Sequence, residues 1–249
     1  MAIAFGIDIG GSGIKGAPVD LDSGDFAAPR TRIPTPQPST PEAIAQVCEQ
    51  LVAGAQLAEG DPVGVTFPAP IKHGEVGFIA NLDQSWQGVN VPDLLSTRLG
   101  HRVLAVNDAD AAGYAESVYG AARGKEGLVI VTTLGTGIGS AFIFNGTLLP
   151  NTELGHLPLD GESAEVWASS AARKRENLSF KAWATRLQRY YSILDTLFSP
   201  DLIVVGGGVS KHHEEFLPRL ELRCPIVPAA LRNQAGIVGA ARLAAENYT

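Results

Sequence analysis

The stretch Asp8-Ile9-Gly10-Gly11-Ser12-Gly13-Ile14-Lys15 joins two apolar segments, residues 4–9 and residues 14–19. Apolar runs on both sides of a glycine turn predict the two strands of a β-hairpin. Glycines carry no Cβ, so backbone N–H groups can approach phosphate oxygens there, and Asp8 at the end of the first strand can hold Mg²⁺, usually through water. A glycine hairpin can also be only a turn, and this segment alone leaves both interpretations open.

The same plan returns in the second half of the chain. Leu134-Gly135-Thr136-Gly137-Ile138-Gly139 follows a β-branched run at residues 128–133 and precedes a strand at residues 141–144. The hydroxyl of Thr136 is a further candidate donor to phosphate. The repetition predicts two related α/β domains that face each other across a cleft. We expect their limits at residues 1–110 and 111–249, with a closing helix near residues 237–249 that could pack back on the first domain.

A third glycine turn, Gly206-Gly207-Gly208, follows a buried strand at residues 202–205. In a two-domain phosphate-binding architecture it would lie where the sugar and base of a nucleotide bind, although a connection from strand to helix needs glycine in any case. Further strands are predicted at residues 63–67 and 103–106. Helices are predicted from Pro41 onward and at residues 92–99, 108–119, 163–172 and 180–198.

Composition limits the classes of function. Apolar residues make up 45% of the 249 residues and charged residues 18%, as in ordinary globular proteins. The net charge of −7 disfavours nucleic-acid binding across a broad basic face. No apolar run reaches the roughly 20 residues that cross a bilayer, and no signal peptide is recognisable. Cys48 and Cys224 are too few for a disulfide framework. A cytoplasmic protein without a membrane partner is expected.

Several polar residues are candidates for chemistry. Asp108 follows a buried strand, where a carboxylate can accept the proton of an attacking hydroxyl, but an aspartate there can equally be a helix N-cap. Glu153 and His156 could bind vicinal sugar hydroxyls, lie in a surface loop, or form part of a zinc site, for which no further ligands stand at metal spacing. Further polar and aromatic candidates for a sugar site are Asn81, Asp83, Trp86 and Glu165.

Together these pieces resemble the ROK family (repressor, open reading frame, kinase) of bacterial sugar kinases over nearly the whole chain. The resemblance rests on Asp8-Ile-Gly-Gly-Ser-Gly-Ile-Lys15, Gly64-Val-Thr-Phe-Pro68, Asn107-Asp108, Leu134-Gly-Thr-Gly137, Glu153-Leu-Gly-His156 and Gly206-Gly-Gly208. It implies an α/β, two-domain actin-like ATPase (ribonuclease H-like) fold and a homodimer.

The resemblance also implies roles for residues. Asp108 would be the general base in transfer of a phosphoryl group to the 6-hydroxyl of glucose. Sugar contacts would come from Asn81, Asn107, Asp108, Glu153, His156 and Glu165. Donor phosphates would be bound by Asp8, Gly10, Gly11, Ser12, Lys15, Gly135, Thr136, Gly137, Gly207 and Gly208, with Mg²⁺ held near Asp8 through water.

One departure from the family pattern is informative. Many ROK members follow Gly-His with a cysteine-rich zinc motif, and residues 157–170 contain no cysteine, so structural zinc is not expected. With the short chain and the runs Ala168-Ser-Ser170, Leu187-Gln-Arg-Tyr190, Phe198-Ser-Pro-Asp201 and Gly206-Gly-Gly-Val-Ser-Lys211, this resembles the polyphosphate glucokinase branch. Members of that branch take phosphate from inorganic polyphosphate, and some also use ATP or phosphorylate mannose.

One segment is strongly basic. Residues 173–189 carry six cationic side chains and one acid, which leaves the rest of the chain at −12 (−7 − 5). As a hypothesis, these cations guide a polyphosphate chain. Alternatively, they solvate the outer face of a helix whose other face is apolar. The six residues are Arg173, Lys174, Arg175, Lys181, Arg186 and Arg189.

Three other functions compete with this prediction. A strictly ATP-dependent ROK hexose kinase would share every site residue but use another donor. A sugar-responsive repressor needs a DNA-binding domain ahead of the first glycine loop, and that loop begins near residue 8, so a repressor is not expected. A sugar-binding module would have no need of Asp8, Asp108 and both glycine loops together. The sequence leaves open the donor preference and the choice between glucose and mannose.

Overall fold

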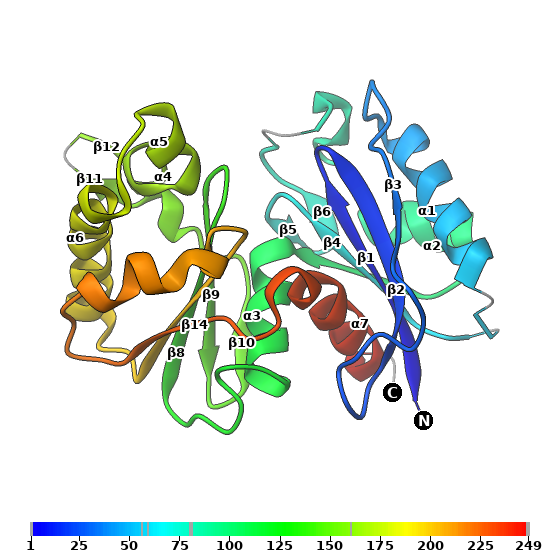
Figure 1. Cartoon of the computed structure of the whole chain (residues 1–249). Coiled ribbons are helices and arrows are strands. Elements are labelled where there is room, and N and C mark those ends of the chain that lie inside the picture. The colour runs from blue at the N-terminus through cyan, green and yellow to red at the C-terminus, as the bar shows by residue number, and fades with distance from the viewer. Residues whose placement is uncertain (1, 56, 59, 80–81, 160, 248–249) are drawn as a thin grey trace. The chain divides into compact units, whose positions relative to one another are not determined.

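The computed structural model describes residues 2–247 apart from residues 56, 59, 80–81 and 160. The chain divides into two compact units (Figure 1). The first comprises Met1–Ala115 with Gln234–Thr249, and the second comprises Glu116–Asn233. Within the described residues, no helix combines the length and the apolar character that a membrane span requires.

Each unit is built on a five-stranded mixed sheet, and the two sheets have the same strand order. In the first the order is β3-β2-β1-β4-β7 and in the second it is β10-β9-β8-β13-β14. Three antiparallel strands are followed in each sheet by two parallel ones. The prediction of two related α/β units is therefore confirmed by topology. The strands are β1 (Ile3–Gly10), β2 (Gly13–Asp20), β3 (Thr31–Ile33), β4 (Val63–Phe67), β7 (Val103–Asn107), β8 (Leu128–Leu134), β9 (Ile138–Phe144), β10 (Thr147–Leu149), β13 (Leu202–Gly206) and β14 (Ile226–Pro228).

Among the described residues, two small hairpins and five 3₁₀ turns lie outside these sheets, and sequence patterns did not predict them. They are too short for a period of 2 or 3.6 to be recognised. The hairpins are β5 (Ile71–Lys72) with β6 (Glu75–Val76) and β11 (Pro158–Leu159) with β12 (Glu162–Ser163). The 3₁₀ turns are η1 (Gln84–Trp86), η2 (Leu154–His156), η3 (Ser210–Glu215), η4 (Leu217–Arg219) and η5 (Arg232–Gln234).

Most helices begin and end where the sequence predicts. Helix α6 starts after Ser179, whose hydroxyl accepts the N–H of Ala182, and ends at Ser199 in a left-handed conformation. Its buried face belongs to the core of the second unit. The helices are α1 (Pro41–Ala55), α2 (Val91–Leu99), α3 (Asp108–Val118), α4 (Ala164–Ala168), α5 (Ser170–Arg175), α6 (Phe180–Phe198) and α7 (Ala235–Asn247).

The single helix predicted at residues 163–172 is wrong. The structure has two short helices, α4 and α5, separated at Ser169. Ser169 is extended (ψ 163°), and its buried hydroxyl accepts the N–H of Ala172, 3.1 Å away. A serine that caps a new helix competes with continuation of the old one. The break turns the start of α5 toward the loop at Gly135, whose carbonyl accepts the N–H of Ala171.

Helix α7 returns to the first unit, where it packs on β1 and β4 (Figure 1, red beside blue). Contact is close because Gly64 has no side chain: a Cβ there would lie 1.8 Å from the carbonyl oxygen of Ala240. Tyr114 donates a hydrogen bond to Glu246 and ties the end of α7 to α3. The chain thus changes unit after Ala115 and after Asn233, whereas the predicted domain limit lay at residue 110.

Candidate active site

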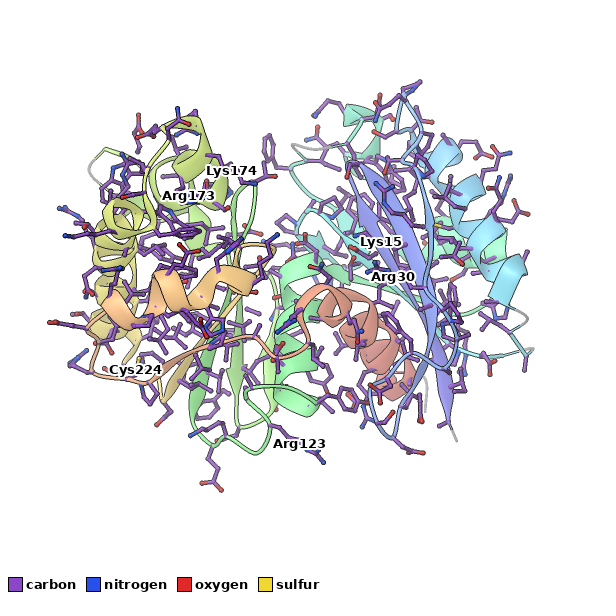
Figure 2. All side chains as sticks on the ribbon, viewed as in Figure 1. Lys15, Arg30, Arg123, Arg173, Lys174 and Cys224 are labelled. Carbon is purple, nitrogen blue, oxygen red and sulfur yellow. The ribbon has the colours of Figure 1, made fainter. Side chains whose placement is uncertain are left out.

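Asp8 lies at the end of β1, next in register to Lys15 on β2 and Thr66 on β4. One carboxylate oxygen accepts from Lys15 Nζ at 2.7 Å, and the other accepts from the buried hydroxyl of Thr66 at 3.0 Å. Figure 2 shows Lys15 on this hairpin. Both oxygens therefore have partners, and the Lys15 ammonium occupies one side of the carboxylate. This arrangement suits a metal held through water better than one bound directly to the carboxylate.

The first glycine loop joins β1 and β2 through Gly11 and Ser12, with Gly10 paired to Gly13. Two of its carbonyl oxygens accept side-chain hydrogen bonds: Arg32 donates to the Ser12 oxygen at 2.8 Å, and the Thr35 hydroxyl donates to the Gly10 oxygen. Hydrogen bonds from β3 and from the segment after it thus hold the loop in place. With these two carbonyl oxygens engaged, the N–H groups of the loop are its candidates for binding a phosphate.

Asn107, and not Asp108, caps helix α3. The buried Asn107 side-chain oxygen accepts the N–H groups of Ala109 at 2.9 Å and Asp110 at 3.2 Å, so Asn107 is the cap of α3. Asp108 is the first residue of the helix, and its side chain is exposed and accepts the Ala109 N–H at 2.8 Å. The interpretation of Asp108 as the N-cap is therefore wrong.

Glu153, His156 and Glu165 come together in the second unit. His156 Nε2 lies 3.9 Å from a Glu153 carboxylate oxygen, and His156 Nδ1 lies 3.8 Å from a Glu165 carboxylate oxygen. Burial raises the pKa of the Glu153 carboxyl, the His156 charge partly offsets this, and Glu165 adds to the rise. Two carboxylates on either side of an imidazole offer several acceptors and a donor to hydroxyl groups.

Glu165 also contacts the second glycine loop, residues 135–137. One of its carboxylate oxygens accepts the N–H of Ile138 at 3.2 Å. A Cβ on Gly137 would lie 2.2 Å from the same oxygen, so the contact requires glycine at this position. The predicted hydroxyl-binding cluster and the predicted phosphate loop are therefore neighbours within the second unit.

The second glycine loop borders a pocket of about 420 Å³. We call it the second-loop pocket and define it by Gly135, Thr136, Arg173, Lys174, Gly208 and Lys211, which line it. Figure 2 shows Arg173 and Lys174 on α5, beside the β8–β9 hairpin. Gly207 of the third glycine turn packs directly against Leu134, at the start of the second glycine loop. Its φ is +82°, and a Cβ at this position would lie 2.5 Å from the Leu134 carbonyl oxygen. The two glycine turns of this unit therefore meet at one place.

The six cations of the basic segment do not behave as one surface. Arg175 and Arg186 both bind Glu176, and Arg186 also donates to the Trp167 carbonyl oxygen at 2.9 Å. These contacts lower the pKa of the Glu176 carboxyl, chiefly through the hydrogen bond from Arg186. Arg173 and Lys174 instead line the second-loop pocket. Four of the six cations thus fall into two pairs, one that lines the pocket and one that binds Glu176.

Other sequence candidates have different outcomes. Asn81 lies outside the described residues. Trp86 is fully buried, donates to the Ser39 carbonyl oxygen and packs edge-on against Phe67, so its proposed role at a sugar is wrong. Asp83 caps η1, and hydrogen bonds from Ser85 lower the pKa of its carboxyl.

Two functional candidates were missed in the sequence. Thr66 stands within an apolar strand pattern that gives no sign of a polar role, but its hydroxyl orients Asp8. Lys211 follows the third glycine turn by three residues and lines the second-loop pocket. A cation soon after a glycine turn was the available signal for Lys211, whereas Thr66 needs the pairing of β4 with β1 to be recognised.

Comparisons with known proteins show the family of this chain. Residues 4–177 match the ROK family. A polyphosphate glucokinase from Mycobacterium tuberculosis (strain CDC 1551 / Oshkosh) is 47% identical over 246 residues, which cover 98% of this chain and 92% of that protein. The solved structure of an inorganic polyphosphate/ATP-glucomannokinase from Arthrobacter sp. strain KM is 55% identical, with a TM-score of 0.93 and coverage of 99% and 100%.

A more distant structure extends the comparison. A ROK family glucokinase from Streptomyces griseus, solved in complex with glucose and AMPPNP, is 27% identical, with a TM-score of 0.82 over 98% of this chain and 99% of that one. The likeness to these sugar kinases over the full described fold confirms the predicted two-domain actin-like ATPase fold class.

Proposed function

We propose that this chain, which belongs to the ROK family, transfers a phosphoryl group from inorganic polyphosphate, and also from ATP, to the 6-hydroxyl of glucose. Sequence identity of 47% to a polyphosphate glucokinase over 98% of the chain supports this activity. Likeness to the glucomannokinase supports both donors and adds mannose as a second acceptor. The observation at the site that carries the proposal is the exposed carboxylate of Asp108, which is not needed to cap α3.

In this proposal Asp108 is the general base. Its carboxylate accepts the proton of the 6-hydroxyl as that oxygen attacks phosphorus, and it orients the hydroxyl for in-line displacement. Its position at the first turn of α3 places the carboxylate beside the partial positive charge of the helix N-terminus. Asn107 holds that turn in place, so any contact it makes with sugar uses its amide nitrogen.

The sugar hydroxyls are assigned to Asn81, Asn107, Glu153, His156 and Glu165. Glu153 and Glu165 accept hydrogen bonds, while His156 acts as donor or acceptor according to its tautomer. The mutual approach of the last three side chains supports this assignment, because a hexose presents hydroxyl groups on adjacent carbons.

Donor phosphates are assigned to the two glycine loops. N–H groups near Gly10, Gly11 and Ser12 and near Gly135, Thr136 and Gly137 stabilise negative charge on the transferring group. Lys15 adds a cation beside the first loop, and Gly207 and Gly208 support the second. Kinases of this kind use a divalent metal; we assign Mg²⁺ to Asp8 through water, where it would neutralise phosphate charge.

The proposal also includes a homodimer and a cytoplasmic location. Both cysteines, Cys48 and Cys224, are free thiols, which fits a reducing compartment. Burial raises the pKa of the Cys48 thiol to about 12, so this residue is an unreactive core side chain.

A strictly ATP-dependent hexose kinase is the alternative, since it requires the same base and the same sugar contacts.

A coupled assay for glucose 6-phosphate tests the proposal. Purified protein with Mg²⁺ and glucose, then mannose, is given long-chain polyphosphate or ATP at matched phosphate concentrations. We expect turnover with both donors. Turnover with ATP alone would establish the alternative, and turnover with neither donor would contradict the kinase itself.

A further inference from the structure

The second-loop pocket carries an excess of positive charge. Arg173, Lys174 and Lys211 line it, and none of its described lining residues is acidic. His212 also lines it, and Glu215 lies 3.3 Å from His212 Nδ1. Among the described residues, neither Lys174 nor Lys211 has an ion-pair partner. In a chain of net charge −7, this is a local site of the opposite sign.

The three cations differ in how firmly they are held. The Arg173 guanidinium lies 4.2 Å from the centroid of the Phe180 ring and donates to the Leu178 carbonyl oxygen at 3.2 Å. Its Nε is enclosed and has no hydrogen-bond acceptor among the described residues. Arg173 is therefore a fixed charge in the wall of the pocket. Lys174 and Lys211 are exposed and come from different elements, α5 and η3.

Two exposed lysines on separate elements suit a ligand whose charge extends along its length. Polyphosphate carries about one negative charge per phosphate unit, whereas the charge of ATP ends at its α-phosphate. Flexible lysines bind phosphate as mobile point charges and so tolerate different positions of a chain. ATP has only three phosphates, so these lysines have no further phosphate to bind when ATP is the donor.

We propose that Lys174 and Lys211 determine donor specificity by binding the part of a polyphosphate chain that extends beyond its reacting end. This inference rests on the proposed function, since it takes the second glycine loop as the site of the transferring phosphates. The inference assigns donor binding to Lys174, in the basic segment, and to Lys211, outside it. It gives no role in donor binding to Lys181, Arg175 or Arg186.

Steady-state kinetics of a Lys174→Ala/Lys211→Ala double variant test the inference. KM for long-chain polyphosphate should rise about tenfold or more, while KM for ATP and for tripolyphosphate should rise less than about threefold. A Lys174→Arg/Lys211→Arg variant should recover most of the affinity for the long chain. Lys181→Ala is the control, because this lysine is also exposed and belongs to the basic segment but does not line the pocket.

Equal changes in KM for ATP and long polyphosphate would overturn the inference, as would a Lys181→Ala effect as large as that of the double variant. Unchanged KM values would do the same. Unaltered melting temperatures show that the variants are folded. If the parent protein uses ATP but not polyphosphate, the inference fails while the kinase assignment stands; if it uses neither, the proposed function fails as well.

Discussion

Asn107 and Asp108 are adjacent, but the structure gives them separate tasks. Asn107 is buried and caps α3, whereas Asp108 is exposed one residue later. Asp108→Asn should therefore lower kcat by about 10²–10⁴, the usual contribution of a general base, and leave the melting temperature unchanged. Activity and thermal unfolding measured on one preparation check both statements. Full turnover in Asp108→Asn would remove this residue from the role of base.

Asn107→Ala is the matched variant. Loss of the cap should lower the free energy of unfolding by about 1 kcal/mol, because the N–H groups of Ala109 and Asp110 lose their acceptor. Chemical denaturation measures this change. A stable Asn107→Ala together with an unstable Asp108→Asn would reverse the two assignments.

Glu153 predicts a pH dependence for sugar binding. Burial raises the pKa of its carboxyl above the ordinary 4.5, so the carboxylate takes up a proton at a higher pH than an exposed glutamate does. The ionised form accepts hydrogen bonds from hydroxyls, and its loss should raise KM for glucose as the pH falls toward and through this raised pKa. A KM profile measured from neutral to acid pH checks this, with Glu153→Gln expected to remove the change.

His156 lies beside Glu153 and Glu165, so the pH experiment needs a control variant at this position. His156→Asn keeps a hydrogen-bonding side chain but removes the imidazole. The assignment to Glu153 is contradicted if the acid rise in KM persists in Glu153→Gln and disappears in His156→Asn.

At the level of elements, Glu116 joins the end of α3 to the segment after β14. Its carboxylate is 1% exposed and accepts the N–H groups of Ala121 at 2.7 Å, Ala230 at 3.1 Å and Leu231 at 2.8 Å. A glutamine would replace an accepting oxygen by an NH₂ group that faces N–H donors. We expect Glu116→Gln to lower the free energy of unfolding by about 2–3 kcal/mol.

Denaturant unfolding measures this, with Glu126→Gln as control. Glu126 is an exposed glutamate on the loop after α3, and its replacement should change the free energy of unfolding by less than about 0.5 kcal/mol. Equal changes in the free energy of unfolding for the two substitutions would show that the hydrogen bonds of the buried Glu116 carboxylate do not stabilise the fold.

The contact between β13 and the second glycine loop depends on Gly207. Its φ is +82°, and a Cβ at this position would lie 2.5 Å from the Leu134 carbonyl oxygen, so Gly207→Ala strains the turn and displaces the loop. Stability should fall by about 1–3 kcal/mol, and KM for the phosphate donor should rise. Gly208→Ala is the stability control, since nothing lies within 4 Å of its Cβ position. Equal stability of the two variants would contradict this account.

For the whole molecule, the charge distribution predicts a difference between substrates. The chain has net charge −7, so an anionic donor is attracted only near its local cations, and this attraction is screened by salt. Raising the ionic strength from about 0.01 M to about 0.15 M shortens the Debye length from about 30 Å to about 8 Å. KM for polyphosphate should rise over this range while KM for neutral glucose stays constant. Parallel changes for both would instead indicate an effect of salt on the fold.

The sequence by itself determined the longer strands of the two sheets, the glycine loops, most helices and the family. Apolar runs next to glycine turns specify local conformation without reference to distant residues, which is why β4 and α6 have the predicted bounds. Even a strong helical pattern failed at Ser169, where a side-chain hydrogen bond to the backbone competes with the helix.

Only the tertiary structure decided which polar side chains meet. Strand pairing brings Thr66 to Asp8, the packing of α5 and η3 places Lys174 and Lys211 in the lining of one pocket, and Trp86 is part of the core. Contacts between residues far apart in the chain depend on register and packing, which no local pattern encodes. The sequence indicated which side chains are candidates for the site, and the packing of each unit determined which of them lie close enough together to bind one ligand.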